Sequence, residues 1–348
     1  MTQSAETIWN EDTVFVSYAQ NYEDVMLWRA LKHVPRGFYL DVGAWSPDED
    51  SITRAFYERG WRGLNLEPNL EWQAQLSAKR PEDINLPLAI ADRPGSETFY
   101  FFANLGLSTL DAAVAERHMA EGWTAEPGTV EVTTLNAVWE AHVGGRDVHF
   151  LKIDVEGFEE QVLRGNDWRA HRPWIVVVES TQPMSRIESH ALWEAILTDA
   201  DYRLAYRDGL NRFYVAAEHA ELLPALQYPP NVFDRFVRAA EAASESRADE
   251  AERLAESARA SAAAAEARAT EADARAETSA ARADEAEARA QAAEARAQAA
   301  EARALSAEAR AESAESQLHH VYHSKSWRWT APLRKLKGPL AAIRLYQE

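Results

Sequence analysis

Two acidic residues stand at the ends of two apolar segments near the start of the chain. Residues 38–44 form an apolar run that contains Asp41, and residues 63–68 form a second run that reaches Glu67. A helical stretch, 51–59, separates them. This strand–helix–strand order predicts both carboxylates at the carboxyl edge of a parallel sheet, where open α/β folds bind ligands. Because a carboxylate accepts two hydrogen bonds from a vicinal diol, the pair predicts a nucleoside-containing cofactor.

The loop after the first acid indicates which cofactor fits. A dinucleotide-binding loop carries the pattern Gly-x-Gly-x-x-Gly, whereas residues 41–47 read DVGAWSP and hold one glycine. Without that phosphate cradle, the pattern favours S-adenosylmethionine, which has a cationic end and no phosphate. The single glycine would let the backbone approach the ligand closely. The alternative is that the two acids only cap helices. The predicted cofactor contacts are Asp41, Gly43, Ala44, Glu67, Ala89 and Asp92.

A third strand end carries the candidate catalytic residues. Residues 149–154 are a further apolar run that ends in Asp154, and Glu156 and a glycine follow. By strand alternation the two acids point to the same side. A carboxylate there could orient a hydroxyl or act as its general base. The alternative is that one of them caps a helix at 158–165. Paired acids also bind hard cations, but the spacing identifies no third ligand, so no metal site is predicted.

The apolar segments around these acids predict a mostly parallel, doubly wound α/β sheet. Several of them are near-continuous Val, Ile and Leu runs, as in parallel strands that are covered on both faces. The last two flank a turn-rich loop and read as an antiparallel hairpin. The expected strands are 38–44, 63–67, 84–90, 99–102, 149–154, 174–179, 202–206 and 212–216.

Composition excludes several classes of function. The 348 residues include no cysteine, which excludes disulfides, thiolate zinc sites and cysteine nucleophiles. The net charge of −19 argues against a nucleic-acid partner. Residues 1–12 show neither a basic nor an apolar signal region, and no apolar run approaches the roughly 20 residues of a membrane span. We therefore expect a cytoplasmic protein, without a signal peptide.

A long segment of Ala, Glu and Arg follows the globular part. Arginine recurs every seven residues from Arg268 to Arg310. With Arg289 at heptad position g, alanines fall at a and d and Glu294 falls at e, which is the charge pattern that pairs helices in a parallel coiled coil. Self-association is the favoured interpretation, and a solvated single helix held by alanine propensity is the alternative.

The end of the chain is short and basic. Residues 325–345 mix tryptophans with Lys and Arg, a combination that suits the headgroup zone of an anionic membrane. The alternative is a cap that folds back onto the rest of the chain. The segment also resembles the ends of bacterial glycosyltransferases that act on surface polysaccharides, which implies contact with such an enzyme or with the cytoplasmic membrane face. The predicted regions are 1–13 (flexible), 14–236 (globular), 237–318 (coiled coil) and 319–348 (basic and aromatic).

Residues 17–183 as a whole resemble the FkbM-type methyltransferase family. The shared motifs are YAQNYED at 18–24, LDVGA at 40–44, GWRG at 60–63 before Glu67, TTL at 133–135, FLKIDVEG at 150–157, VLRG at 162–165 and RP at 172–173. The resemblance implies a class I methyltransferase-like (Rossmann-like) fold that uses S-adenosylmethionine to methylate hydroxyl oxygens of sugars or natural products. It implies cofactor contacts at Asp41, Gly43 and Glu67, and a reaction site at Asp154 and Glu156. Residues 45–47 depart from the family pattern, which commonly has Asn-x-Gly there.

These observations predict methyl transfer to a sugar hydroxyl in a surface polysaccharide, a related glycan or a natural product. One alternative is a non-catalytic coiled-coil scaffold of a glycan-assembly complex, built on a methyltransferase-like domain. Another is a nicotinamide oxidoreductase, which the missing phosphate loop disfavours. His118 is a lone histidine in an Ala/Glu/Met context, and we expect it at the surface.

Overall fold

The computed structural model describes residues 14–103 and 106–308, with side chains up to residue 300. The predicted segments 1–13 and 319–348 lie outside the described residues, as does the end of the predicted coiled coil. The chain divides near residue 250 into two compact units, and each is described by itself. Among the described helices, none combines the length and the apolar character needed to cross a bilayer.

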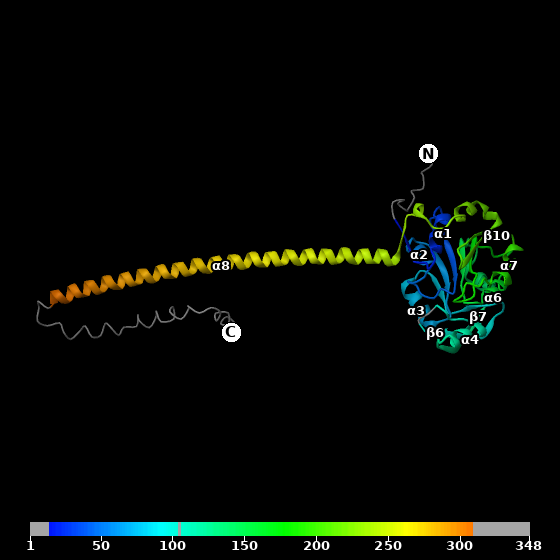
Figure 1. Cartoon of the computed structure of the whole chain (residues 1–348), viewed down its shortest axis with the longest axis horizontal. Helices are drawn as coiled ribbons and strands as arrows, with labels where there is room; N and C mark the ends of the chain where they lie inside the picture. Colours follow the sequence, from blue (N-terminus) through cyan, green and yellow to red (C-terminus); the bar gives the residue numbers. More distant parts are fainter. Residues whose placement is uncertain (1–13, 104–105, 309–348) are drawn as a thin grey trace, which may run out of the picture. The chain divides into compact units, whose positions relative to one another are not determined.

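A seven-stranded mixed sheet forms the centre of the first unit (Figure 1). Its strands are β2 (Phe38–Val42), β3 (Arg62–Leu66), β4 (Ile84–Leu86), β8 (Phe150–Ile153), β9 (Ile175–Glu179), β10 (Tyr202–Arg207) and β11 (Asn211–Ala216). They lie in the order β10-β11-β9-β8-β2-β3-β4. The five strands from β9 to β4 run parallel, whereas β10 and β11 form the expected antiparallel hairpin. Strand β2 is central: the next strands in the chain, β3 and β4, lie on one side of it, and the later strands, from β8 onward, lie on the other.

Helices cover both faces of this sheet. They are α1 (Glu23–Leu31), α2 (Arg54–Glu58), α3 (Leu70–Lys79), α5 (Leu135–Val138), α6 (Glu159–Arg164) and α7 (Glu194–Thr198), with short helical turns at Trp139–Val143, His190–Leu192, Ala217–Leu226 and Val232–Asp234. Alternate strand residues enter two separate cores. Tyr39 belongs to the core that contains Met26 of α1, and Leu40 belongs to the core that contains Leu163 of α6.

A second, three-stranded sheet and a helix complete the globular unit. The strands are β5 (Ala89–Ile90), β6 (Gly95–Phe102) and β7 (Ala125–Thr133), in the order β5-β7-β6, and α4 (Ala112–Ala120) connects β6 to β7. The prediction of one strand at 84–90 was wrong, because Pro87 interrupts it and its halves belong to different sheets. Strand β7 was not predicted, since Pro127 and Gly128 interrupt its pattern like a turn.

His118 is buried, and its predicted surface position was wrong. The side chain lies on α4 with 0% of its surface exposed. Its ring packs edge-on against Phe102 of β6, with the ring centroids 5.5 Å apart. The Ala/Glu/Met context was misleading because His118 lies on the face of α4 that packs against the small sheet.

The two ends of the globular part pair with each other. Strand β1 (Phe15–Ser17) runs parallel to β12 (Phe236–Arg238). The long helix α8 (Ala239–Glu308) therefore begins two residues after the predicted boundary. Its 70 residues span about 105 Å, and the pairs Glu271–Arg275 and Glu285–Arg289 stabilise it from within. The coiled-coil pairing of α8 stays a prediction.

Candidate active site

Two cavities open beside the carboxyl ends of β2, β3 and β8, at the point where the strand order reverses. The first is lined mainly by apolar and aromatic side chains, among them Leu66, Trp72, Leu88, Ile90 and Phe99, together with Glu67. The second is more polar and includes Gln20, Glu23, Trp123, Lys152 and Asn211. Both linings contain Gly43, Trp45, Gly106, Asp154 and Glu156. Two adjoining ligands could therefore meet at these shared residues.

Glu67 follows β3 and lies at the wall of the first cavity. Its carboxylate accepts hydrogen bonds from the backbone N–H of Trp45 at 2.9 Å and of Asn69 at 2.8 Å. Burial raises the pKa of Glu67 to about 7, against the lowering effect of these two hydrogen bonds. Each carboxylate oxygen keeps a second lone pair. The group can therefore accept further hydrogen bonds from a ligand, and it is not a helix cap, since Asn69 caps α3.

Gly43 lines both cavities, but its lack of a side chain serves the protein itself. It has a φ of +79°, and a Cβ built on it would lie 1.9 Å from the backbone oxygen of Asp154. The backbone of the loop after β8 approaches this glycine closely, so Gly43 fixes where that loop lies. The predicted close approach of a ligand to Gly43 stays a prediction.

Asp41 is buried below the cavities. Only 1% of its surface is exposed, and neither cavity lining includes it. It accepts a hydrogen bond from the Thr53 hydroxyl at 2.9 Å, and its Oδ1 lies 3.4 Å from Nζ of Lys152. Asp41 does not cap α2, whose N-cap Thr53 points its hydroxyl toward Asp41. A cofactor contact by Asp41 stays a prediction.

Lys152 links the buried Asp41 to Asp154 in the lining of both cavities. Its Nζ donates to the Gly43 carbonyl at 2.6 Å and lies 3.5 Å from Asp154. Burial acts against its charge, but Asp154 and Asp41 outweigh this and raise the pKa of Lys152. The lysine is therefore a fixed cation that holds both shared loops in place.

The loop at 45–47 forms an aromatic wall. Trp45 adopts a positive φ of 44°, and its ring lies edge-on to Trp72, with the centroids 5.4 Å apart. Ser46 accepts hydrogen bonds from the backbone N–H groups of Asp48 and Glu49. Residues 45–47 thus supply a tryptophan that both cavities share.

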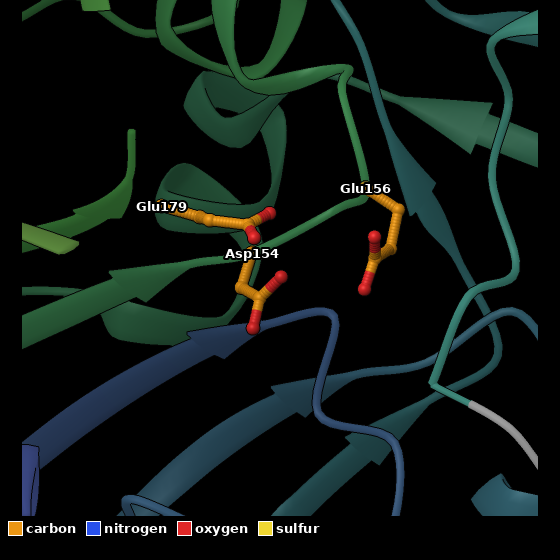
Figure 2. Close-up of side chains that lie close together, drawn as sticks. All are labelled: Asp154, Glu156 and Glu179. Atoms are coloured by element: carbon orange, nitrogen blue, oxygen red, sulfur yellow. The ribbon is translucent and has the colours of Figure 1, made fainter. Parts of the chain in front are cut away.

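Asp154 and Glu156 lie close together, but not through strand alternation. Strand β8 ends at Ile153, and Glu156 has a positive φ of 55°. This turn brings its carboxylate back toward Asp154 (Figure 2). Neither acid caps α6, which has no side-chain cap. Burial, and after it the charge of Asp154, raises the pKa of Glu156.

Glu159 holds the loop that carries these acids. Its carboxylate accepts hydrogen bonds from the backbone N–H of Val155 at 3.2 Å and of Gly157 at 3.1 Å. It is 2% exposed, and burial raises its pKa to about 7. Sequence reasoning missed this supporting role, although Glu159 belongs to the same conspicuous acidic stretch.

Glu179 is a third carboxylate at the same place, and sequence reasoning did not select it. It is the last residue of β9, the neighbour of β8. One oxygen of Glu179 lies within 4.8 Å of ligand oxygens of Asp154 and Glu156. Burial, followed by the charges of Asp154 and Glu156, raises the pKa of Glu179 well above its usual range. The signal available in the sequence was a lone acid at the end of an apolar strand.

Three polar residues of the second cavity were also missed. Gln20 and Glu23 come from the 18–24 motif, and Asn211 from the start of β11. Asn211 donates to Glu23 at 2.7 Å across 188 positions of sequence. Burial raises the pKa of Glu23 to about 8. The next residue, Asp24, accepts from Ser17 and from backbone N–H groups, so it shapes the loop instead.

The remaining predicted contacts divide between the cavities and the surface. Ala44 lines the second cavity and Ala89 lines the first. Asp92 lies in neither lining; it is exposed and pairs with Arg93 at 3.5 Å. A cofactor contact by Asp92 stays a prediction.

The chain matches a known protein family over most of the residues described above. The family described as "Methyltransferase FkbM domain" matches residues 41–204, which include Glu67, Asp154, Glu156 and Glu179. No curated protein matches the chain. Residues 41–204 are therefore a domain of the FkbM methyltransferase family.

Proposed function

We propose that the chain is an S-adenosylmethionine-dependent O-methyltransferase that methylates a hydroxyl of a sugar in a surface polysaccharide or a related glycan or natural product. The observation that carries the proposal is the pair of adjoining cavities that share Asp154 and Glu156. A methyl transferase must bring a donor and an acceptor together at one point, and this arrangement provides such a point.

The first cavity has the chemistry of an adenosine site. It lies outside the carboxyl ends of parallel strands where the strand order reverses, as ligand sites do in doubly wound sheets. Apolar and aromatic side chains suit a purine, and the Glu67 carboxylate suits the ribose hydroxyls. The order β4-β3-β2-β8-β9-β11-β10, in which only β11 runs against the other strands, supports a class I, Rossmann-like assignment.

The second cavity has the chemistry of a sugar-binding site. Glu23, Gln20 and Asn211 offer both acceptors and donors of hydrogen bonds to hydroxyls. Trp123 and Met184, which are 39% and 65% exposed, supply apolar surface at the same cavity. Polar groups set the orientation of such a ligand, and aromatic surface contributes area.

The residues of the chain act mainly by positioning. Bound S-adenosylmethionine supplies an electrophilic methyl group on a sulfonium. Glu67 would hold its ribose, and Gly43 and Lys152 fix the loops that define where the two ligands meet. Asp154 or Glu156 would orient the acceptor hydroxyl and receive its proton as the new C–O bond forms.

A binding titration tests the proposal. S-adenosylmethionine is titrated calorimetrically into the full chain and into Glu67→Gln, with Glu97→Gln, an exposed acid on β6, as the matched control. We expect binding by the unaltered chain and the control, and a loss of about 10- to 100-fold in Glu67→Gln, because hydrogen bonds to a charged group contribute about 1.5–3 kcal/mol. Absence of binding to the unaltered chain would refute the proposal, and binding of NADH instead would favour an oxidoreductase.

The long helix extends the proposal to assembly and location. The side chains of α8 up to residue 300 are almost all exposed, and its arginine heptads support self-association as a coiled coil. The basic segment 325–345 supports docking to the cytoplasmic membrane face or to a glycosyltransferase. On this proposal the enzyme works in the cytoplasm, beside the assembly of its glycan.

A further inference from the structure

Three carboxylates from two neighbouring strands converge where the two cavities meet. Asp154 and Glu156 follow β8, and Glu179 ends β9. The two strands are parallel, with Ile153 opposite Val178, so the residues that come next emerge at the same edge of the sheet. One oxygen from each carboxylate lies within 4.8 Å of the other two (Figure 2).

Glu179 is a buried carboxylate that lacks a positively charged partner among the described residues. The residue is 7% exposed, and its Oε2 is buried without a hydrogen-bond donor in the described part of the chain. Figure 2 shows its carboxylate turned toward Asp154. A buried carboxylate oxygen without a partner is costly, and native structures rarely leave one in that state.

The nearest cation of the chain, Lys152, does not pair with Glu179. Lys152 lies 3.5 Å from Asp154, but it donates to the Gly43 carbonyl and pairs with Asp41. Among the described side chains, residues 14–103 and 106–300, no ion pair joins a lysine, arginine or histidine to Glu156 or Glu179. The charges of Lys152 and Arg117 act on Glu156 only from farther away. A cation from outside the chain would therefore supply the partner that these carboxylates lack.

We propose that Asp154, Glu156 and Glu179 bind a divalent cation of the Mg²⁺ or Mn²⁺ type. Hard cations prefer carboxylate oxygens, and Mg²⁺ commonly takes a few carboxylates and completes its shell with waters or substrate oxygens. Three protein ligands leave coordination positions free. Because Asp154 and Glu156 line the second cavity, those positions are available to a ligand bound there.

The role of the cation rests on the proposed function, although its binding does not. A cation at this point would hold the acceptor hydroxyl, or two adjacent sugar hydroxyls, and lower the pKa of the oxygen that attacks. In the transfer the C–S bond breaks with its electron pair kept by sulfur, the C–O bond forms, and the hydroxyl proton passes to a carboxylate oxygen that does not bind the metal. The transfer needs no further reactant.

Metal binding is tested on the full chain without any cofactor. Mn²⁺ is titrated at moderate salt and followed by the electron paramagnetic resonance signal of the free ion, with Mg²⁺ titrated calorimetrically in parallel. We expect one tight site per chain. Glu179→Gln and Asp154→Asn should each weaken it by at least about tenfold, since loss of even an outer-sphere partner costs about that much. Glu160→Gln, a half-buried acid paired with Arg164 on α6, is the matched control and should leave the site unchanged.

The outcomes separate this proposal from the proposed function. Absence of a tight Mn²⁺ site, or a site as tight in both variants as in the unaltered chain, would overturn the metal assignment. Two variants guard against misfolding, and circular dichroism checks each. Titration of S-adenosylmethionine in the presence of EDTA reads the cofactor site independently, so a chain that binds the cofactor but no Mn²⁺ refutes only the metal site. In that case the three carboxylates share protons among themselves.

Discussion

The substitution Gly43→Ala tests how the loop after β8, which carries Asp154 and Glu156, is held. A methyl group at this position would lie 1.9 Å from the backbone oxygen of Asp154, whereas real contacts of this kind begin at about 3.0 Å. Because the neighbour is backbone, the loop after β8 must retreat by about 1 Å. The substitution therefore perturbs the proposed reaction site from a residue that has no functional group of its own.

The expected magnitude has two parts. Alanine at a φ of +79° costs about 1–2 kcal/mol, and forcing the loop apart costs about 1–3 kcal/mol more. Gly209→Ala is the matched control, because Gly209 has a φ of +99° and open space around the added methyl. We thus expect Gly43→Ala to lower the free energy of unfolding by about 1–3 kcal/mol more than Gly209→Ala does.

Chemical denaturation of the two variants measures this difference, and methyl transfer from labelled S-adenosylmethionine measures its effect on the site. A displacement of about 1 Å in a reacting group costs about 100-fold in rate, so Gly43→Ala should lose activity far beyond its loss of stability. Equal stability of the two variants, or full activity of Gly43→Ala, would contradict the close packing of the loop.

Three further predictions concern charge, pH and assembly. Lys152→Met should lower the free energy of unfolding by about 3–5 kcal/mol, because it leaves the carboxylate of Asp41 buried without its cation; Lys79→Met, at an exposed lysine, is the control for the same denaturation experiment. Burial raises the pKa of Glu67 to about 7, so its carboxylate becomes protonated below that pH, and calorimetry should show cofactor affinity falling from pH 8 to pH 6; an equal fall in Glu67→Gln would contradict this cause. Light scattering should find an oligomer for the full chain and a monomer for a chain that ends at Arg238, which keeps β12 paired with β1; the same mass per chain in both would exclude self-association through α8.

The strands of the central sheet were readable because burial on both faces leaves a plain sequence signal. Residues 150–153 and 175–178 are almost entirely apolar, and the structure places them as adjacent parallel strands. The hairpin at 202–216 was equally clear. By contrast, β7 exposes one face and contains Pro127, so its sequence pattern resembles a loop. Strand β10 is also largely exposed, but the turn-rich loop after it marked the hairpin, whereas Pro127 and Gly128 inside β7 gave a false turn signal.

The site was only half predictable, because its residues meet through strand order and register. Glu67, Asp154 and Glu156 follow apolar runs directly, and each could be selected from its own segment. Glu179 reaches the site because β9 lies beside β8, and Asn211 reaches it because β11 lies beside β9, with Asn211 opposite Glu179. The pairing of Asp41 with Lys152 likewise follows from the register of β2 and β8, in which the two residues are opposite each other. No spacing within one segment encodes these neighbours.

The position of α1 and β11 has a practical consequence for work with fragments of this protein. The match to the family ends at residue 204 and begins at residue 41, yet α1 lies before it and most of the hairpin after it. A fragment trimmed to the matched residues would lose β11 and leave one edge of β9 unpaired. It would also uncover the core around Phe150 and Ile175 that α1 covers. Such an edge invites aggregation, so a fragment should keep at least the residues from β1 to β12, 15–238, which extend well beyond the residues that match the family.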